Sequence, residues 1–165
     1  MDELLDAFQR AWTERRRAAF AEVCAPDLHW TDPSGTEPLY GPEALAQRAA
    51  RLWKAFPDAK IESAGERLSD GRFVAVPVMV SGVHRGPLEG IPASNRLITI
   101  HAVLYCELDP PREKLWRVRA FFDAYDATVQ LGVLPQRGSL SERAILVLRG
   151  FGLRRGAGDQ LDQRD

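Results

Sequence analysis

Three long runs with the two-residue period of a β-strand dominate this chain, at residues 72–83, 96–108 and 115–123. In the middle run, every second residue from Ile98 onward is apolar, and the residues between them are mixed rather than fully polar. A sheet that is wetted on one face shows a clean alternation of apolar and polar residues, so both faces of this sheet are expected to be covered. The pattern predicts a strongly curved, mostly antiparallel sheet, with helices and a cavity on one side and a second subunit or a flanking segment on the other.

Helical periodicity precedes these strands. Residues 2–24 carry an apolar stripe, and residues 42–55 carry another that begins with a proline suited to the first turn of a helix. A short strand is expected at 27–32, and Asp70-Gly71 predicts the turn of a hairpin. Helices followed by antiparallel strands predict an α+β fold.

The length of 165 residues fits one domain, which we place at residues 1–138. An apolar cluster at 139–153 predicts a helix that docks on the domain or on its partner. Residues 154–165 are polar and are expected to form a flexible tail.

Composition excludes several classes of function. A formal net charge of -1 gives no electrostatic basis for binding nucleic acid or an anionic membrane, and no apolar run approaches the ~20 residues that span a bilayer. The acidic N-terminus is unlike a secretory leader, and Cys24 and Cys106 are expected to be buried free thiols, so we expect a cytoplasmic protein. The three histidines lack metal-site spacing, and the chain has no phosphate-binding loop or dinucleotide fingerprint, so neither a metal nor a cofactor is expected.

Short motifs follow this order of elements: Phe56-Pro57-Asp58, Gly82-Val83-His84-Arg85-Gly86, Gly90-Ile91-Pro92 followed by Arg96, and Asp123 before Gln130-Leu131-Gly132. With them, residues 5–135 resemble the SnoaL-like polyketide cyclases of the ketosteroid-isomerase-like (nuclear transport factor 2-like) superfamily. The resemblance implies a cone-shaped α+β barrel whose curved sheet wraps around the N-terminal helices, and we expect a homodimer through the convex face.

The chain departs from the family pattern at two places. Ala93-Ser94-Asn95-Arg96 stands where the family commonly has Pro-Thr-Gly-Arg, and Arg117 and Arg119 stand where members usually carry Glu and Trp. The chemistry of the pocket is therefore expected to differ from that of the family while the scaffold is kept.

Asp123 is the first candidate for chemistry, because it follows an aromatic strand and precedes a short amphipathic helix. Apolar walls would raise the pKa of its carboxyl group toward the range of a proton-transfer catalyst, and the resemblance implies an acid/base aspartate here. The alternative is an N-cap of the next helix, which would keep the carboxylate ionised. Asp32, in Thr-Asp-Pro, is most simply a turn residue.

Other polar candidates are His101, His84 and Arg119. If the side of the strand that carries His101 faces the cavity, this histidine could stabilise an enolate oxygen beside Asp123. His84 matches a motif position, with loop geometry as the alternative role. Arg119 could bind an anionic group of the ligand, with a salt bridge on the surface or at the dimer interface as the alternative. Apolar walls for a flat polycyclic substrate are expected from Trp30, Trp53, Phe56, Tyr105 and Phe121.

The leading hypothesis is a cofactor-independent cyclase or isomerase that acts on a polyketide-type or other apolar carbonyl compound. By resemblance, Asp123 would remove a proton activated by the carbonyl group and later return it, as in an intramolecular aldol-type cyclisation. A non-catalytic module that binds a small ligand or dimerises is one alternative. An epoxide hydrolase or hydratase is another, and it needs a second carboxylate near Asp123.

Overall fold

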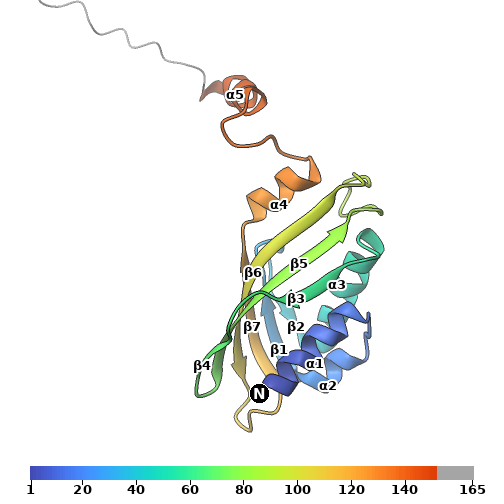
Figure 1. The fold of residues 1–165 in the computed structure, drawn as a ribbon, viewed down its shortest axis with the longest axis vertical. Helices are drawn as coiled ribbons and strands as arrows, with labels where there is room; N and C mark the ends of the chain where they lie inside the picture. The colour runs from blue at the N-terminus through green and yellow to red at the C-terminus, as the bar shows by residue number, and fades with distance from the viewer. Residues whose placement is uncertain (152–165) are drawn as a thin grey trace, which may run out of the picture. The chain divides into compact units, whose positions relative to one another are not determined.

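The computed structural model describes residues 1–151, in two compact units: Met1–Val133 and a second that begins at Leu134. In the first unit, helices α1 (Asp2–Thr13), α2 (Ala19–Val23) and α3 (Gly41–Ala55) lie on one side of a seven-stranded sheet (Figure 1). The strands are β1 (Cys24–Thr31), β2 (Leu39–Tyr40), β3 (Lys60–Ser63), β4 (Leu68–Asp70), β5 (Phe73–Val83), β6 (Leu97–Leu108) and β7 (Leu115–Phe122). The predicted α+β class and the three long strands are confirmed.

The strand order is β2-β1-β7-β6-β5-β3, and β4 also pairs with β5. All of these pairs are antiparallel except β1 with β7. The sheet is curved. It does not close into a barrel, because β2 and β3 lie at its two edges. We call the side toward α1, α2 and α3 the inner face, and the opposite side the outer face.

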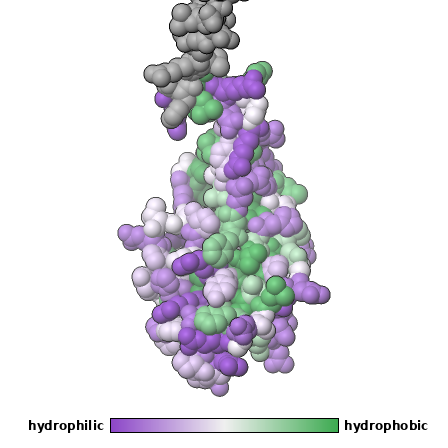
Figure 2. All heavy atoms as spheres, turned by 90° about the vertical axis from the view of Figure 1, so that its left-hand side faces the viewer, coloured by the Kyte–Doolittle hydropathy of each residue, from purple (hydrophilic) through white to green (hydrophobic). Residues whose placement is uncertain are grey.

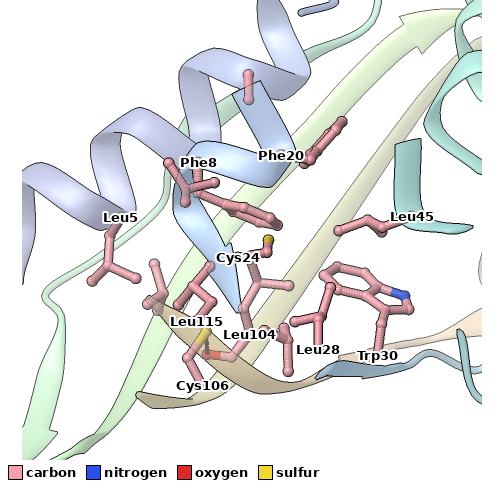
Figure 3. Close-up of a cluster of buried hydrophobic side chains, with 14 of the residues drawn as sticks. Leu5, Phe8, Phe20, Cys24, Leu28, Trp30, Leu45, Leu104, Cys106 and Leu115 are labelled. Carbon is pink, nitrogen blue, oxygen red and sulfur yellow. Dashed lines mark hydrogen bonds between the residues drawn. The ribbon is translucent and has the colours of Figure 1, made fainter. Parts of the chain in front are cut away.

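The core lies on the inner face. Along β5, Val74, Val76 and Val78 are buried, and the residues between them are only half-buried. Figure 3 shows the core side chains, which come from the helices, from β1 and from the long strands, with Phe8 and Phe20 above Leu104 and Leu115. Each large apolar side chain that is fully buried contributes about 1.5–3 kcal/mol to stability. This contribution fixes which face of each strand meets the helices.

The predicted single helix over residues 2–24 is wrong at its centre. The chain turns at Arg15, whose φ of 58° is left-handed, and α1 ends at Thr13. The amide of Arg16 donates back to the carbonyl oxygen of Ala11 at 3.0 Å, which closes the end of the helix. A short second helix then starts at Ala19.

Helix α4 (Ala124–Leu131) completes the first unit. In the second unit, α5 (Leu140–Leu146) and a π-helical turn, η1 (Val147–Phe151), confirm the helical character expected from residue 140 onward. The docking of this segment and the domain boundary at 138 stay predictions, and the expected tail 154–165 lies outside the described residues. No helix in the described part of the chain is long and apolar enough to cross a membrane.

Both cysteines are free and buried, as predicted. Burial raises the pKa of each thiol to about 12, and for Cys24 the neighbouring Cys106 adds to the effect. Since the thiolate is the reactive form, both side chains are inert members of the core at neutral pH.

Candidate active site

The sheet divides the predicted site residues into two groups. Trp30 and Trp53 lie on the inner side, where Trp30 is only 7% exposed and Trp53 packs partly buried against the core. The outer group consists of His101, Tyr105, Arg119 and Phe121, all exposed. In β6 and β7 the buried residues alternate with these four. The side of the strand that carries His101 therefore faces away from the helices, and the expectation of one shared cavity is wrong.

The position of Arg119 also bears on the departure from the family pattern. Arg117 and Arg119 both project from the outer face of β7 and are exposed. The two arginines that replace Glu and Trp therefore do not change the inner side of the sheet. The expected change of pocket chemistry at these two positions is wrong.

Asp123 lies between β7 and α4 and serves as the N-cap of that helix. Its carboxylate accepts a hydrogen bond from the amide of Asp126 at 2.9 Å, and the residue is exposed. Asp123 therefore caps α4 and is not enclosed by apolar walls in the described residues, and its role in proton transfer stays a prediction. The pairing of Ala102 with Phe122 brings Asp123 level with His101, where β7 ends and β6 continues.

Asp32 is a second carboxylate, on the inner side, for which the sequence predicts only a turn. One oxygen accepts from the amide of Ser34 at 2.8 Å, so the turn is confirmed. The other accepts from the indole N–H of Trp30 at 2.8 Å, and the guanidinium of Arg48 lies 3.6 Å away. The side chains of Asp32 and Arg48 are only 11% and 13% exposed. These contacts hold the indole ring of Trp30, which lies on the inner face of the sheet, in one orientation.

The surroundings of Asp32 act on its pKa in opposite directions. Burial alone would raise the pKa of this carboxyl group. Hydrogen bonds from Ser34 and from the indole of Trp30, together with the charge of Arg48, outweigh burial and hold the pKa below its usual range. Asp32 is therefore ionised at neutral pH.

Replacement of Asp32 by Asn is expected to lower the free energy of unfolding by about 1.5–3 kcal/mol at pH 7, because Asn keeps only one of the two acceptor oxygens and lacks the charge that faces Arg48. The stabilisation from a carboxyl group with a lowered folded-state pKa is present above the unfolded-state pKa and is lost as the pH falls. The difference between wild type and Asp32→Asn should therefore shrink below pH ~4.

Urea unfolding between pH 3 and pH 7 measures this difference. Asp27→Asn is the matched control, because Asp27 accepts from the indole of Trp116 at 2.8 Å in an exposed setting. Its effect should stay below about 1 kcal/mol. A penalty for Asp32→Asn that does not change with pH would contradict the ionised state of this side chain.

His84 is fully buried at the end of β5, where its ring packs on that of Phe56 with centroids 5.1 Å apart. Its Nδ1 atom accepts from the amide of Ser94 at 3.2 Å and lies 3.1 Å from the hydroxyl of the same residue, an arrangement that leaves Nε2 as the ring donor. Within the described residues, Nε2 is buried and has no hydrogen-bond partner. A buried donor without a protein partner is uncommon, and a water molecule or a ligand oxygen would satisfy it.

The other motif residues hold loops together rather than line a pocket. The amides of Arg85 and Gly86 donate to the carbonyl oxygen of Ala55 at 2.8 and 3.0 Å, and the carboxylate of Asp58 accepts from the amide of Val83 at 2.9 Å. These contacts tie the end of α3 to the end of β5. The motif Phe56-Pro57-Asp58 therefore has a structural role at the junction of α3 and β5.

The C-terminal motif acts in the same way on β6. The side-chain amide of Gln130 both accepts from the backbone N–H of Thr99 at 2.7 Å and donates to its carbonyl oxygen at 2.8 Å. It satisfies the backbone of β6 beyond the end of β7, as another strand would. Asn95 has a φ of 56°, which explains how it replaces the glycine of the family pattern, since Asn tolerates this conformation.

Aromatic rings gather on the inner side of the unit, between the helices and the sheet. Trp12 lies 6.3 Å from Trp30 and 6.2 Å from Trp53 between ring centroids, and Phe20 stacks on Trp53 at 6.3 Å. We call Phe8, Trp12, Phe20, Trp30 and Trp53 the aromatic cluster. The indole Nε1 of Trp12 is buried and, in the described part of the chain, has no hydrogen-bond partner.

The model of the SnoaL-like polyketide cyclase family matches residues 2–131. The chain belongs to this family. A search of curated proteins returns no match.

Solved structures of similar fold include proposed polyketide cyclases and a proposed hydroxylase. A proposed SnoaL-like polyketide cyclase from Jannaschia sp. CCS1 is 19% identical, with a TM-score of 0.68 over 81% of this chain and 94% of that one. AclR, a proposed hydroxylase from Streptomyces galilaeus, is 18% identical, with a TM-score of 0.70 over 91% of this chain and 92% of that one. IdmH, a proposed polyketide cyclase from Streptomyces antibioticus, is 18% identical, with a TM-score of 0.67 over 80% of this chain and 98% of that one. At these identities the likeness establishes the fold.

Proposed function

We propose that this SnoaL-like protein is a cyclase or isomerase that acts on a small, apolar carbonyl compound of the polyketide type without a cofactor. Membership of the family supports the class of reaction. The observation that carries the substrate class is the aromatic cluster on the inner side, in which a buried indole N–H has no partner among the described residues. A flat carbonyl compound offers both apolar surface for the rings and an oxygen for that donor.

In this proposal the ligand lies against the inner face, with Trp30 and Trp53 as its walls. The buried N–H groups of Trp12 and His84 are the donors that a carbonyl or enolate oxygen would meet. His84 lies five residues beyond Met79, which pairs with His101, so it is about 16 Å along the strand from the position at which β7 ends and Asp123 follows. Of the two donors, we assign His84 to the far end of the ligand rather than to the reacting carbon.

Asp123 is the group we propose for proton transfer. Its carboxylate would remove a proton from the carbon next to the carbonyl group, and the electron pair would form the enolate. The enolate carbon would attack a second carbonyl carbon of the same molecule, whose π electrons would move onto its oxygen, and the proton would then pass from Asp123 to this alkoxide. His101, Tyr105, Arg119 and Phe121 do not enter this site, because they lie on the outer face. Phe122, the half-buried residue before Asp123, replaces Phe121 as the aromatic contact from β7.

Exchange of the acidic C–H protons of 2-tetralone in deuterium oxide, followed by NMR, tests this activity without knowledge of the natural substrate. The proposal predicts exchange that is faster with the protein than in buffer and that saturates with ketone concentration. Exchange at the rate of buffer, with saturable binding of the same ketone, would favour a non-catalytic binding module. The capping contact of Asp123 is the observation that supports this second candidate.

A further inference from the structure

Three buried side-chain donors in the described part of the chain have no hydrogen-bond partner: Nε2 of His84, Nε1 of Trp12 and Nε2 of Gln9. His84 and Trp12 are donors in the proposed function, whereas Gln9 has no role in it. The side chain of Gln9 is half-buried, and its Nε2 atom is fully buried. A buried donor without a partner destabilises the fold, so its presence points to something that it binds.

Gln9 lies on α1 beside a depression of about 280 Å³ between this helix and the edge strand β3. The residues that line the depression are Asp6, Gln9, Arg10, Thr13, Glu14 and Ile61. Residues three apart on a helix are neighbours, so Gln9 also lies next to Trp12 of the aromatic cluster. Gln9 is therefore at the boundary between the depression and the aromatic cluster.

Other polar groups of the depression are engaged elsewhere. The hydroxyl of Thr13 accepts from the amide of Ile61 at 3.2 Å, and this contact ties the end of α1 to β3. The carboxylate of Asp6 pairs with the guanidinium of Arg67. Because neither contact includes Gln9, its Nε2 atom finds no acceptor among the described residues. The acceptor that would satisfy it has to come from a bound molecule.

The opposite side of the sheet offers no such donor. Figure 2 shows the side away from the helices, where apolar side chains gather around the middle and hydrophilic ones surround them. The exposed apolar residues of the outer face include Val103, Tyr105 and Phe121. Among the described residues, no buried donor without a partner belongs to this face. The donors that could recognise a ligand oxygen lie instead on α1 and at the end of β5.

Two donors one turn apart on a helix match a ligand with two neighbouring oxygen atoms. In a β-dicarbonyl unit, two carbonyl groups flank a single carbon atom, and both oxygens can point to the same side. Carbonyl oxygens accept hydrogen bonds and do not donate them, so they complement the N–H groups of Trp12 and Gln9. A ligand with one carbonyl group would leave one of these two donors unpaired.

We propose that Gln9 is a specificity-determining residue, which binds a second carbonyl oxygen of the ligand beside the first oxygen, held by Trp12. The ligand thus carries a β-dicarbonyl unit, the repeating unit of an unreduced polyketide chain. This inference rests on the proposed function, because it needs a ligand on the inner side of the sheet. It does not depend on the proton transfer assigned to Asp123, in which Gln9 takes no part.

Isothermal titration calorimetry of the full chain with two matched ketones tests this role. 2-Acetyl-1-tetralone carries the β-dicarbonyl unit, and 2-ethyl-1-tetralone has a methylene group in place of the second carbonyl group. One hydrogen bond is worth about 2- to 10-fold in affinity, and the wild type should prefer the acetyl compound by this factor. Gln9→Met should bind both ketones with the affinity that the wild type has for the ethyl compound.

Two further variants complete the binding test. Trp12→Phe should weaken the binding of both ketones, because it removes the donor that they share. Gln47→Met is the matched control and should keep the wild-type preference, since Gln47 is exposed on α3 and donates to Glu43 at 3.3 Å. Equal affinities of the wild type for the two ketones, or a preference that survives Gln9→Met, would overturn the role of Gln9 and leave the proposed function standing. Failure of the wild type to bind either ketone would reject the proposed function and this inference with it.

Urea unfolding gives a second readout that needs no ligand. Methionine is unbranched, as glutamine is, but has no N–H group, so Gln9→Met removes a buried donor that has no partner in the described residues. The midpoint of unfolding should therefore stay unchanged or rise, while the preference for the acetyl compound is lost. A lower midpoint would show that the amide of Gln9 is hydrogen-bonded within the folded protein, and it would overturn the inference.

Discussion

Asp123→Asn is expected to lower the rate of ketone proton exchange by ~10²–10⁴-fold, the usual contribution of one positioned acid/base group. Asparagine cannot take up the proton, yet it caps a helix as well as aspartate does. The hydrogen bond from the amide of Asp126 is therefore kept, and the stability of α4 should hardly change. This substitution separates the two roles of the side chain.

Asp123→Ala is the comparison that removes both roles at once. It should lose the same activity and, in addition, about 0.5–2 kcal/mol of stability through the lost cap. The variant Asp27→Asn changes an exposed carboxylate outside the site, and it should catalyse exchange of the ketone protons at the wild-type rate. Full activity in Asp123→Asn would remove this residue from the mechanism, and loss of activity in Asp32→Asn alone would transfer the role to the inner carboxylate.

Gly86→Ala should lower the free energy of unfolding of the first unit far more than most surface substitutions do. A Cβ atom at this position would lie 2.3 Å from the carbonyl oxygen of Lys54, which is backbone and cannot rotate away. The loop must shift, and the hydrogen bonds from Arg85 and Gly86 to Ala55 would be lost with the close contact. Overpacking and two lost hydrogen bonds together cost about 2–5 kcal/mol.

Urea or thermal unfolding measures this penalty. Gly65→Ala is the matched control, because a Cβ atom there would lie at an ordinary 3.4 Å from the ring of Pro77. The control should change stability by less than about 1 kcal/mol. Equal effects of the two substitutions would show that the motif from Gly82 to Gly86 does not brace the end of α3.

Much of the fold follows from local patterns in the sequence. The alternation of residues in β6 predicts the strand and the division of its side chains between two faces. Asp70-Gly71 predicts the hairpin turn, in which Gly71 has a φ of 62°. Pro42 lies in the first turn of α3, as predicted. The end of α1 at Thr13 does not follow from the sequence, because the left-handed residue after it is Arg15 rather than a glycine.

The candidate site was harder to predict, for a physical reason. The period of two assigns His101, Val103 and Tyr105 to one face, but it does not say which face meets the helices when both are partly apolar. Burial of Leu104 and Cys106 decides the question in the structure. Asp32 could have been found, because it continues the alternation of Leu28 and Trp30, both of which point inward.

The central claim is that a carbonyl ligand binds on the inner side of the sheet, and fluorine NMR of protein labelled with 5-fluorotryptophan tests it most directly. Of the four tryptophans, three belong to the aromatic cluster: Trp12, Trp30 and Trp53. The fourth, Trp116, lies apart from it and donates a hydrogen bond to the exposed Asp27. Single Trp→Phe variants assign the signals. Titration with 2-tetralone should shift the signals of Trp12, Trp30 and Trp53 in a saturable manner and leave that of Trp116 unchanged. A shift of the Trp116 signal alone, or of none of the four, would contradict a site on the inner face.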